Sequence, residues 1–178
     1  MNTFELKILE LHWISDTDQE KDLCAHGRVF VRIGNEIIAN KDTFKLTLSS
    51  TALYLLRSLY SDYDCEKNGY GNQLLPCCGH FMFQAEKGID FVVITGCPYG
   101  IDWKIIHTTD NKIKHISEKG TEAIIEFEEY RKIVFDFADE VEVFYLKSEP
   151  KTLPKDDFEK DGYLTFWREW KELRNRLN

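Results

Sequence analysis

The stretch Gln73-Leu74-Leu75-Pro76-Cys77-Cys78-Gly79-His80 is followed by two apolar runs and then by Gly96-Cys97-Pro98-Tyr99-Gly100-Ile101-Asp102-Trp103. The apolar runs, 81–84 and 89–95, lie on either side of Gly88 and are typical of β-strands. Gly and Pro at both ends of the stretch are residues that favour turns. The pattern therefore predicts two turns that bracket the middle of an antiparallel sheet, with the cysteines at the strand ends.

More strands are predicted on both sides of this stretch. Apolar residues alternate with polar ones over 4–13, but the alternation changes phase once, which indicates a β-bulge. The dipeptide Gly34-Asn35 lies between two further alternating runs and predicts a hairpin. A β-meander is predicted from 79 to about 116, with strands at 81–84, 89–95, 101–108 and 112–116, and 121–127 is predicted to add one more strand.

Three segments carry apolar residues at helical spacing. The first helix is predicted to follow Ser49 or Ser50, because a hydroxyl oxygen caps the orphan N–H groups of a first turn. The second is predicted over 128–146, and the third over 163–177 as an aromatic cover on the core. The order of elements predicts a single α+β domain over 1–178, with a mainly antiparallel sheet and about three helices packed on it.

Composition restricts the functional classes. The chain of 178 residues has a net charge of −8, which argues against nucleic acid as a partner, because phosphate binding needs clustered Lys and Arg. No apolar run approaches the length of a membrane span, and no secretory segment is visible. Five cysteines without regular spacing indicate reduced thiols, so a cytoplasmic protein is predicted.

A metal site is one hypothesis for the opening stretch. Cys77, Cys78, His80 and Cys97 are ligand types that zinc prefers, and a pair of strands would bring Cys97 towards Cys77 or Cys78. The paired Cys-x-x-Cys spacing of common zinc sites is absent, and adjacent cysteines on an extended backbone point to opposite faces. The alternative is that these are small buried thiols, since free cysteine is among the most buried residues.

A nucleophilic cysteine is a second hypothesis, because a thiol is activated by a base within hydrogen-bond reach. The candidate pairs are Cys97 with His107 and Cys78 with His80. On a strand, His107 would share a face with Trp103, which favours a structural histidine. No complete catalytic motif is present in the sequence.

Acidic residues are concentrated on the second predicted helix. Such a row is usually a solvated face, but it would also attract a basic protein and raise the association rate. The residues predicted to bind such a partner are Glu128, Glu129, Asp136, Asp139 and Glu140.

The arrangement of Asp22-Leu23-Cys24-Ala25-His26-Gly27, Leu48-Ser49-Ser50-Thr51-Ala52-Leu53 and the two cysteine turns resembles small uncharacterised bacterial α+β proteins. Some similar proteins are immunity proteins encoded beside polymorphic or contact-dependent toxins. The resemblance implies a cytosolic, non-enzymatic protein that neutralises a toxin by covering its active surface. This protein-binding function is the first prediction, and a metal- or thiol-dependent protein that uses the cysteine cluster is the alternative.

Overall fold

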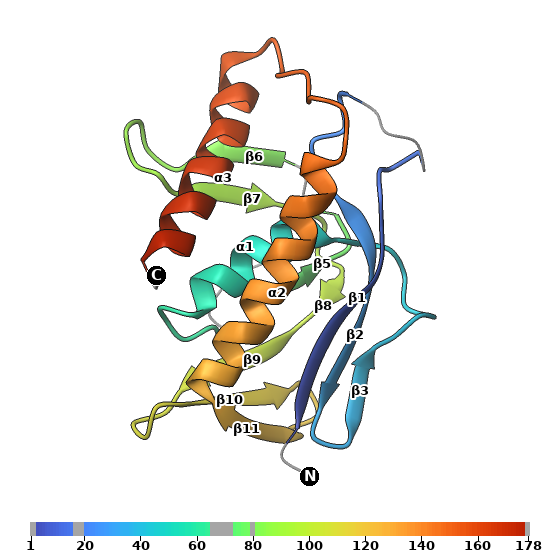
Figure 1. The fold of residues 1–178 in the computed structure, drawn as a ribbon, viewed down its shortest axis with the longest axis vertical. Helices are drawn as coiled ribbons and strands as arrows, with labels where there is room; N and C mark the ends of the chain where they lie inside the picture. Colours follow the sequence, from blue (N-terminus) through green and yellow to red (C-terminus); the bar gives the residue numbers. More distant parts are fainter. Residues whose placement is uncertain (1–2, 16–19, 65–72, 79–80, 177–178) are drawn as a thin grey trace.

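Every strand pairing in the described residues is antiparallel, and the strands are divided among four sheets (Figure 1). The computed structural model describes residues 3–15, 20–64, 73–78 and 81–176. The largest sheet contains four strands: β1 (Phe4–His12), β2 (His26–Ile33), β3 (Glu36–Ala39) and β4 (Leu46–Thr47). A meander contains β9 (Trp103–His107), β10 (Lys112–Ser117) and β11 (Glu122–Glu126), and two short pairs join β5 (Leu75–Pro76) to β8 (Gly100–Ile101) and β6 (Phe81–Gln84) to β7 (Val92–Thr95).

The four-stranded sheet confirms two local predictions. The register of β1 against β2 shifts between Ile8 and Glu10, so the change of phase in the sequence corresponds to a β-bulge. Gly34 lies between β2 and β3 with a φ of +58°, a conformation that glycine adopts without steric penalty. The hairpin predicted at Gly34-Asn35 is therefore present.

The central helix is α1 (Leu48–Ser58), where every residue except Arg57 is buried. It contacts α2, α3 and β5, so the helix is buried on nearly all sides and not only along one apolar stripe. The cap prediction is wrong. The helix begins at Leu48, so Ser49 and Ser50 lie inside the first turn, and Thr47 at the cap makes no side-chain capping bond.

The other two helices both pack on α1. In addition, α2 contacts β1, β10 and β11, and α3 contacts β6 and β7. The helix α2 (Phe127–Leu146) begins one residue before the predicted segment, and α3 (Asp157–Asn175) begins six residues before its predicted start. Asp156 caps α3 by accepting the backbone N–H of Glu159 at 3.1 Å. Gly162 is required within this helix because an added Cβ would lie 2.1 Å from the carbonyl oxygen of Met82.

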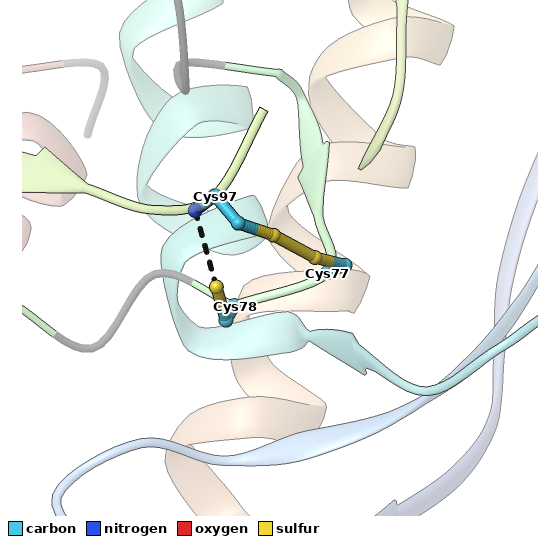
Figure 2. Close-up of side chains that lie close together, drawn as sticks. All are labelled: Cys77, Cys78 and Cys97. Atoms are coloured by element: carbon cyan, nitrogen blue, oxygen red, sulfur yellow. Dashed lines mark hydrogen bonds between the residues drawn. A yellow bond between two sulfur atoms is a disulfide. The ribbon is translucent and has the colours of Figure 1, made fainter. Parts of the chain in front are cut away.

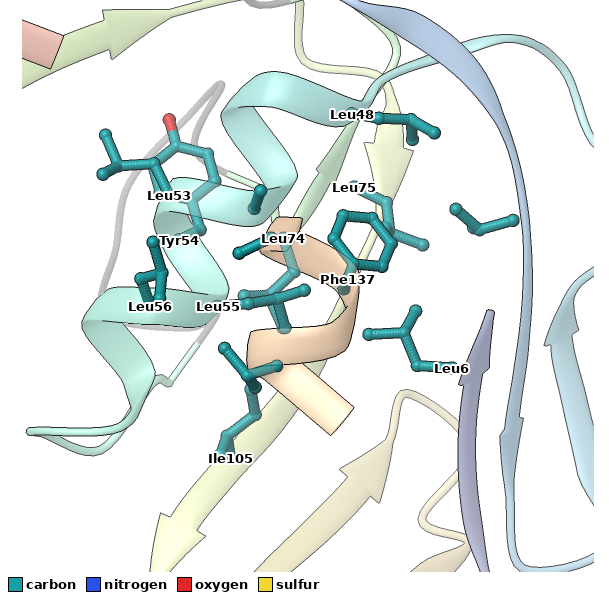
Figure 3. Close-up of a cluster of buried hydrophobic side chains, with 14 of the residues drawn as sticks. Leu6, Leu48, Leu53, Tyr54, Leu55, Leu56, Leu74, Leu75, Ile105 and Phe137 are labelled. Carbon is teal, nitrogen blue, oxygen red and sulfur yellow. The ribbon is translucent and has the colours of Figure 1, made fainter. Parts of the chain in front are cut away.

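One cluster of buried side chains holds residues from all three helices and from both large sheets. Figure 3 shows the part of this cluster around α1. Trp170 is buried and Trp167 is half-buried, so the aromatic face of α3 covers the core as predicted. Leu74 and Leu75 are fully buried beside α1 and fix the chain immediately before the cysteine turn. The α+β class with three helices and antiparallel sheets is confirmed.

Candidate functional site: a three-cysteine cluster

The short ladder of β5 and β8 brings the two cysteine turns together. Leu75 pairs with Ile101 and Pro76 with Gly100, and the next residue, Cys77, donates its N–H to the carbonyl of Tyr99 at 3.0 Å. Cys97 lies two residues before Tyr99, so the register alone carries it towards Cys77. The close approach of strands β5 and β8 requires Gly100, since an added Cβ would lie 2.7 Å from the carbonyl oxygen of Leu75.

Three sulfur atoms meet at this point (Figure 2). Cys77 and Cys97 are joined by a disulfide, and the Sγ atoms of Cys77, Cys78 and Cys97 all lie within 4.8 Å of one another. The backbone N–H of Cys97 donates to Cys78 Sγ at 3.1 Å. All three residues are half-buried.

The structure corrects two expectations about these residues. The sequence indicated reduced thiols, whereas Cys77 and Cys97 form a disulfide. The sequence also indicated that only one of Cys77 and Cys78 would reach a common site. The strand β5 ends at Pro76, so the two cysteines lie beyond the extended segment and are free of its alternation. His80, the fourth predicted ligand, lies outside the described residues.

The neighbouring turn is held by a half-buried carboxylate. Asp102 Oδ1 accepts the backbone N–H groups of Leu74 and Trp103, both at 3.1 Å, and Oδ2 accepts the hydroxyl of Tyr63 at 3.0 Å. Burial raises the pKa of Asp102 to about 6, although these hydrogen bonds oppose the shift. Asp102 therefore ties the segment before the cysteines to the segment after them.

The other thiol and histidine candidates have separate environments. Cys24 is buried, and burial raises the pKa of its thiol to about 12, so the sulfur remains protonated and inert. The ring of His107 contacts the carbonyl oxygen of Ser58 through Nε2 at 2.8 Å, which satisfies it structurally. Among the described residues, Cys77, Cys78 and Cys97 are the one group of potential metal ligands whose donor atoms converge.

The predicted partner-binding acids are all exposed on α2. Three of them form ion pairs within the chain: Glu128 with Arg131 at 2.6 Å, Asp136 with Lys132, and Asp139 with Arg174. Burial, followed by the charge of Asp136, raises the pKa of Glu140. Pairing with basic neighbours therefore offsets part of the negative charge of this face, which the sequence pattern did not reveal.

A scan of protein-family models finds no match to this chain, and neither the search of curated proteins nor that of solved structures finds one. The resemblance to immunity proteins therefore stays a prediction from sequence. Within the described residues, no helix has both the length and the apolar character needed to cross a membrane.

Proposed function

We propose that this chain is a thiol-dependent protein whose working centre, Cys77, Cys78 and Cys97, alternates between a disulfide and the free thiolates formed when a small-molecule dithiol reduces that disulfide and is itself oxidised. The observation that carries the proposal is the third sulfur, since Cys78 Sγ lies within 4.8 Å of both sulfurs of the Cys77–Cys97 disulfide. An isolated disulfide is a static cross-link, whereas one with an adjacent thiol has an exchange partner.

The exchange reaction follows from the positions of the sulfurs. The Cys78 thiolate attacks Cys97 Sγ, a Cys78–Cys97 bond forms, and the Cys77–Cys97 bond breaks. Cys77 leaves as a thiolate and takes a proton from water, so no oxidant is consumed. The Cys97 N–H that donates to Cys78 Sγ holds this sulfur beside the disulfide that it attacks.

The test is to follow the opening of the disulfide in dithiol–disulfide buffers and to map the pairing by mass spectrometry. Opening should be reversible, and a Cys78–Cys97 species should appear at partial reduction. Cys78→Ser should abolish this species and slow opening, whereas Cys24→Ala, which removes a thiol outside the cluster, should leave both unchanged. A Cys78→Ser variant that opens as fast as the wild type, together with the absence of a Cys78–Cys97 species from the wild type, would count against the proposal.

Protein binding through the acidic face of α2 is a second candidate function, and it is the function that the sequence favoured. Its support is geometric. At about 100° per residue, Glu128, Glu129, Asp136, Asp139 and Glu140 occupy an arc of about 120° on one side of the helix. Val143 and Leu146 lie on the same arc, with exposures of 43% and 77%. A face that combines negative charge with exposed apolar side chains suits a basic protein partner, such as a toxin.

This second candidate is tested by a pull-down from the native host with a charge-reversed face, Glu129→Lys with Asp136→Lys and Glu140→Lys. The matched control reverses three exposed acids elsewhere, Asp42, Glu86 and Glu118. A basic protein that the wild type and the control retain, and that the face variant loses, would support the proposal. Equal retention by all three proteins, or no retained protein, would contradict it.

A further inference from the structure

We propose that the reduced three-cysteine cluster binds Zn²⁺ through the Sγ atoms of Cys77, Cys78 and Cys97, so that the disulfide and the metal are alternative states of the same sulfurs. This inference rests on the proposed function, because the metal can bind only after the disulfide opens. It adds a ligand class to the site and a chemical reason for three cysteines where a disulfide needs two.

The separation of the sulfurs fits one tetrahedral ion. With Zn–S bonds of about 2.3 Å, two thiolates on the same zinc lie roughly 3.8 Å apart. The three Sγ atoms already lie within 4.8 Å of one another. The Cα atoms of Cys77 and Cys97 are 7.0 Å apart, which is beyond the usual range of roughly 4.4–6.8 Å for a disulfide. This spacing leaves room for an ion between the two side chains once the S–S bond opens.

The backbone holds the ligands in place before a metal arrives. The hydrogen bond from Cys77 N–H to Tyr99 and the buried pair Leu74 and Leu75 fix one turn, while Gly100 permits the close approach of the other. The Cys97 N–H bond to Cys78 Sγ orients a ligand sulfur and offsets its charge, as outer hydrogen bonds do around metal-bound ligands.

The ligand chemistry favours zinc over the hard divalent ions. Three thiolates are soft donors that suit zinc and disfavour Mg²⁺ and Ca²⁺, which prefer oxygen. Three protein ligands on a half-buried site leave one coordination position for water or an outside molecule, as in zinc sites with an open position.

Oxidation of two of the cysteines releases the metal. A small-molecule disulfide accepts two electrons from the Cys77 and Cys97 thiolates and becomes two thiolates. The Cys77–Cys97 bond forms, and the zinc ion leaves with its charge unchanged. The protein therefore exchanges zinc for a disulfide when the thiol pool becomes oxidising.

The experiment measures zinc on the full chain, reduced and then freed of reductant under nitrogen. Elemental analysis after zinc loading should give one ion per chain for the reduced protein and none for the protein oxidised with glutathione disulfide. Cobalt loading should give a sulfur-to-metal charge-transfer band. Cys78→Ser and Cys97→Ser should each weaken zinc binding by about 100-fold or more in competition with a chromophoric chelator, since loss of even an outer partner of a metal ligand costs about 10–100-fold, whereas Cys24→Ala should bind as the wild type does. Circular dichroism checks that each variant is folded.

The two proposals fail in different ways. A reduced, folded wild type that binds no more zinc than the double variant Cys77→Ser with Cys97→Ser would overturn the zinc inference, even if the disulfide still exchanges with Cys78. Zinc binding that depends on all three cysteines in a protein without a Cys78–Cys97 species would support the metal site and refute the exchange function.

Discussion

Glu169 on α3 binds Arg57 on α1 through two hydrogen bonds, and its side chain is only 5% exposed. The distances are 2.7 Å from Arg57 Nε to Oε1 and 2.9 Å from Nη2 to Oε2. Oε2 also accepts the backbone N–H of Val92 at 2.8 Å, and Arg57 donates to the carbonyl oxygen of Val92 at 2.6 Å. One carboxylate and one guanidinium therefore join α1, α3 and β7.

Replacing Glu169 with alanine should lower the free energy of unfolding by about 3–5 kcal/mol, because it leaves a largely buried guanidinium without its counter-ion and Val92 N–H without an acceptor. The contact between the Arg57 guanidinium and the ring of Phe91, at 4.1 Å, remains and keeps the loss within this range. The net value of the pair is smaller than this loss, because both charges are desolvated in the folded state. Replacing both residues with methionine should therefore be less destabilising than Glu169→Ala alone.

The assay is urea unfolding, with the midpoint compared at constant slope so that a change in midpoint reports stability. The matched control is Glu172→Ala, which removes the exposed pair with Arg176 on the same helix and should change stability by about 0–1 kcal/mol. The reasoning fails if Glu169→Ala loses less than about 1 kcal/mol, or if the double methionine variant is the less stable of the two.

Three further predictions concern the site and its surroundings. Gly100→Ala should separate β5 from β8, because its Cβ would lie 2.7 Å from the carbonyl oxygen of Leu75. Faster reduction of the Cys77–Cys97 disulfide than in the wild type would show this, and an unchanged rate would contradict it. Burial raises the folded pKa of Asp102 to about 6 from 3.8, so protonation favours the folded state. The stability of the wild type relative to Asp102→Asn should rise by about 1.4 kcal/mol per pH unit as pH falls from about 6 towards 4; a flat difference in urea unfolding would refute it. Burial lowers the folded pKa of His115 to about 3 from 6.5, so the unfolded chain binds the proton first. The stability of the wild type relative to His115→Gln, whose amide oxygen can still accept Trp103 Nε1–H, should fall by about 1.4 kcal/mol per unit below pH 6.5; a difference that rises with acid would show that His115 is not held neutral.

Local patterns predicted the fold well where one rule acted alone. The helix α2 has a strict apolar repeat, and its predicted limits differ from the structure by one residue. The start of α3 was missed because Asp156, Asp157 and Gly162 read as loop residues. Asp156 is in fact the cap, and Gly162 is explained by a backbone from β6 that no local pattern contains. Likewise, the run from Ile101 to Ile105 alternates apolar and polar residues, yet the strand is interrupted at Asp102, whose carboxylate binds Leu74, 28 residues earlier.

The same distinction explains what the sequence revealed of the site. Residue type and proximity along the chain identified Cys77, Cys78 and Cys97, and strand pairing gave a reason for their approach. The convergence of all three depends on where β5 stops, because one more extended residue would turn the Cys77 and Cys78 side chains to opposite faces. That end point is set by the register of only two residue pairs, Leu75 with Ile101 and Pro76 with Gly100, and by the absence of a Cβ at residue 100. Two residue pairs are too few to show a periodic pattern in the sequence. The residue types therefore indicate that a cysteine site exists, but tertiary contacts determine its geometry. The consequence is that substitutions in the ladder should alter the sulfur chemistry even though none of them touches a sulfur atom.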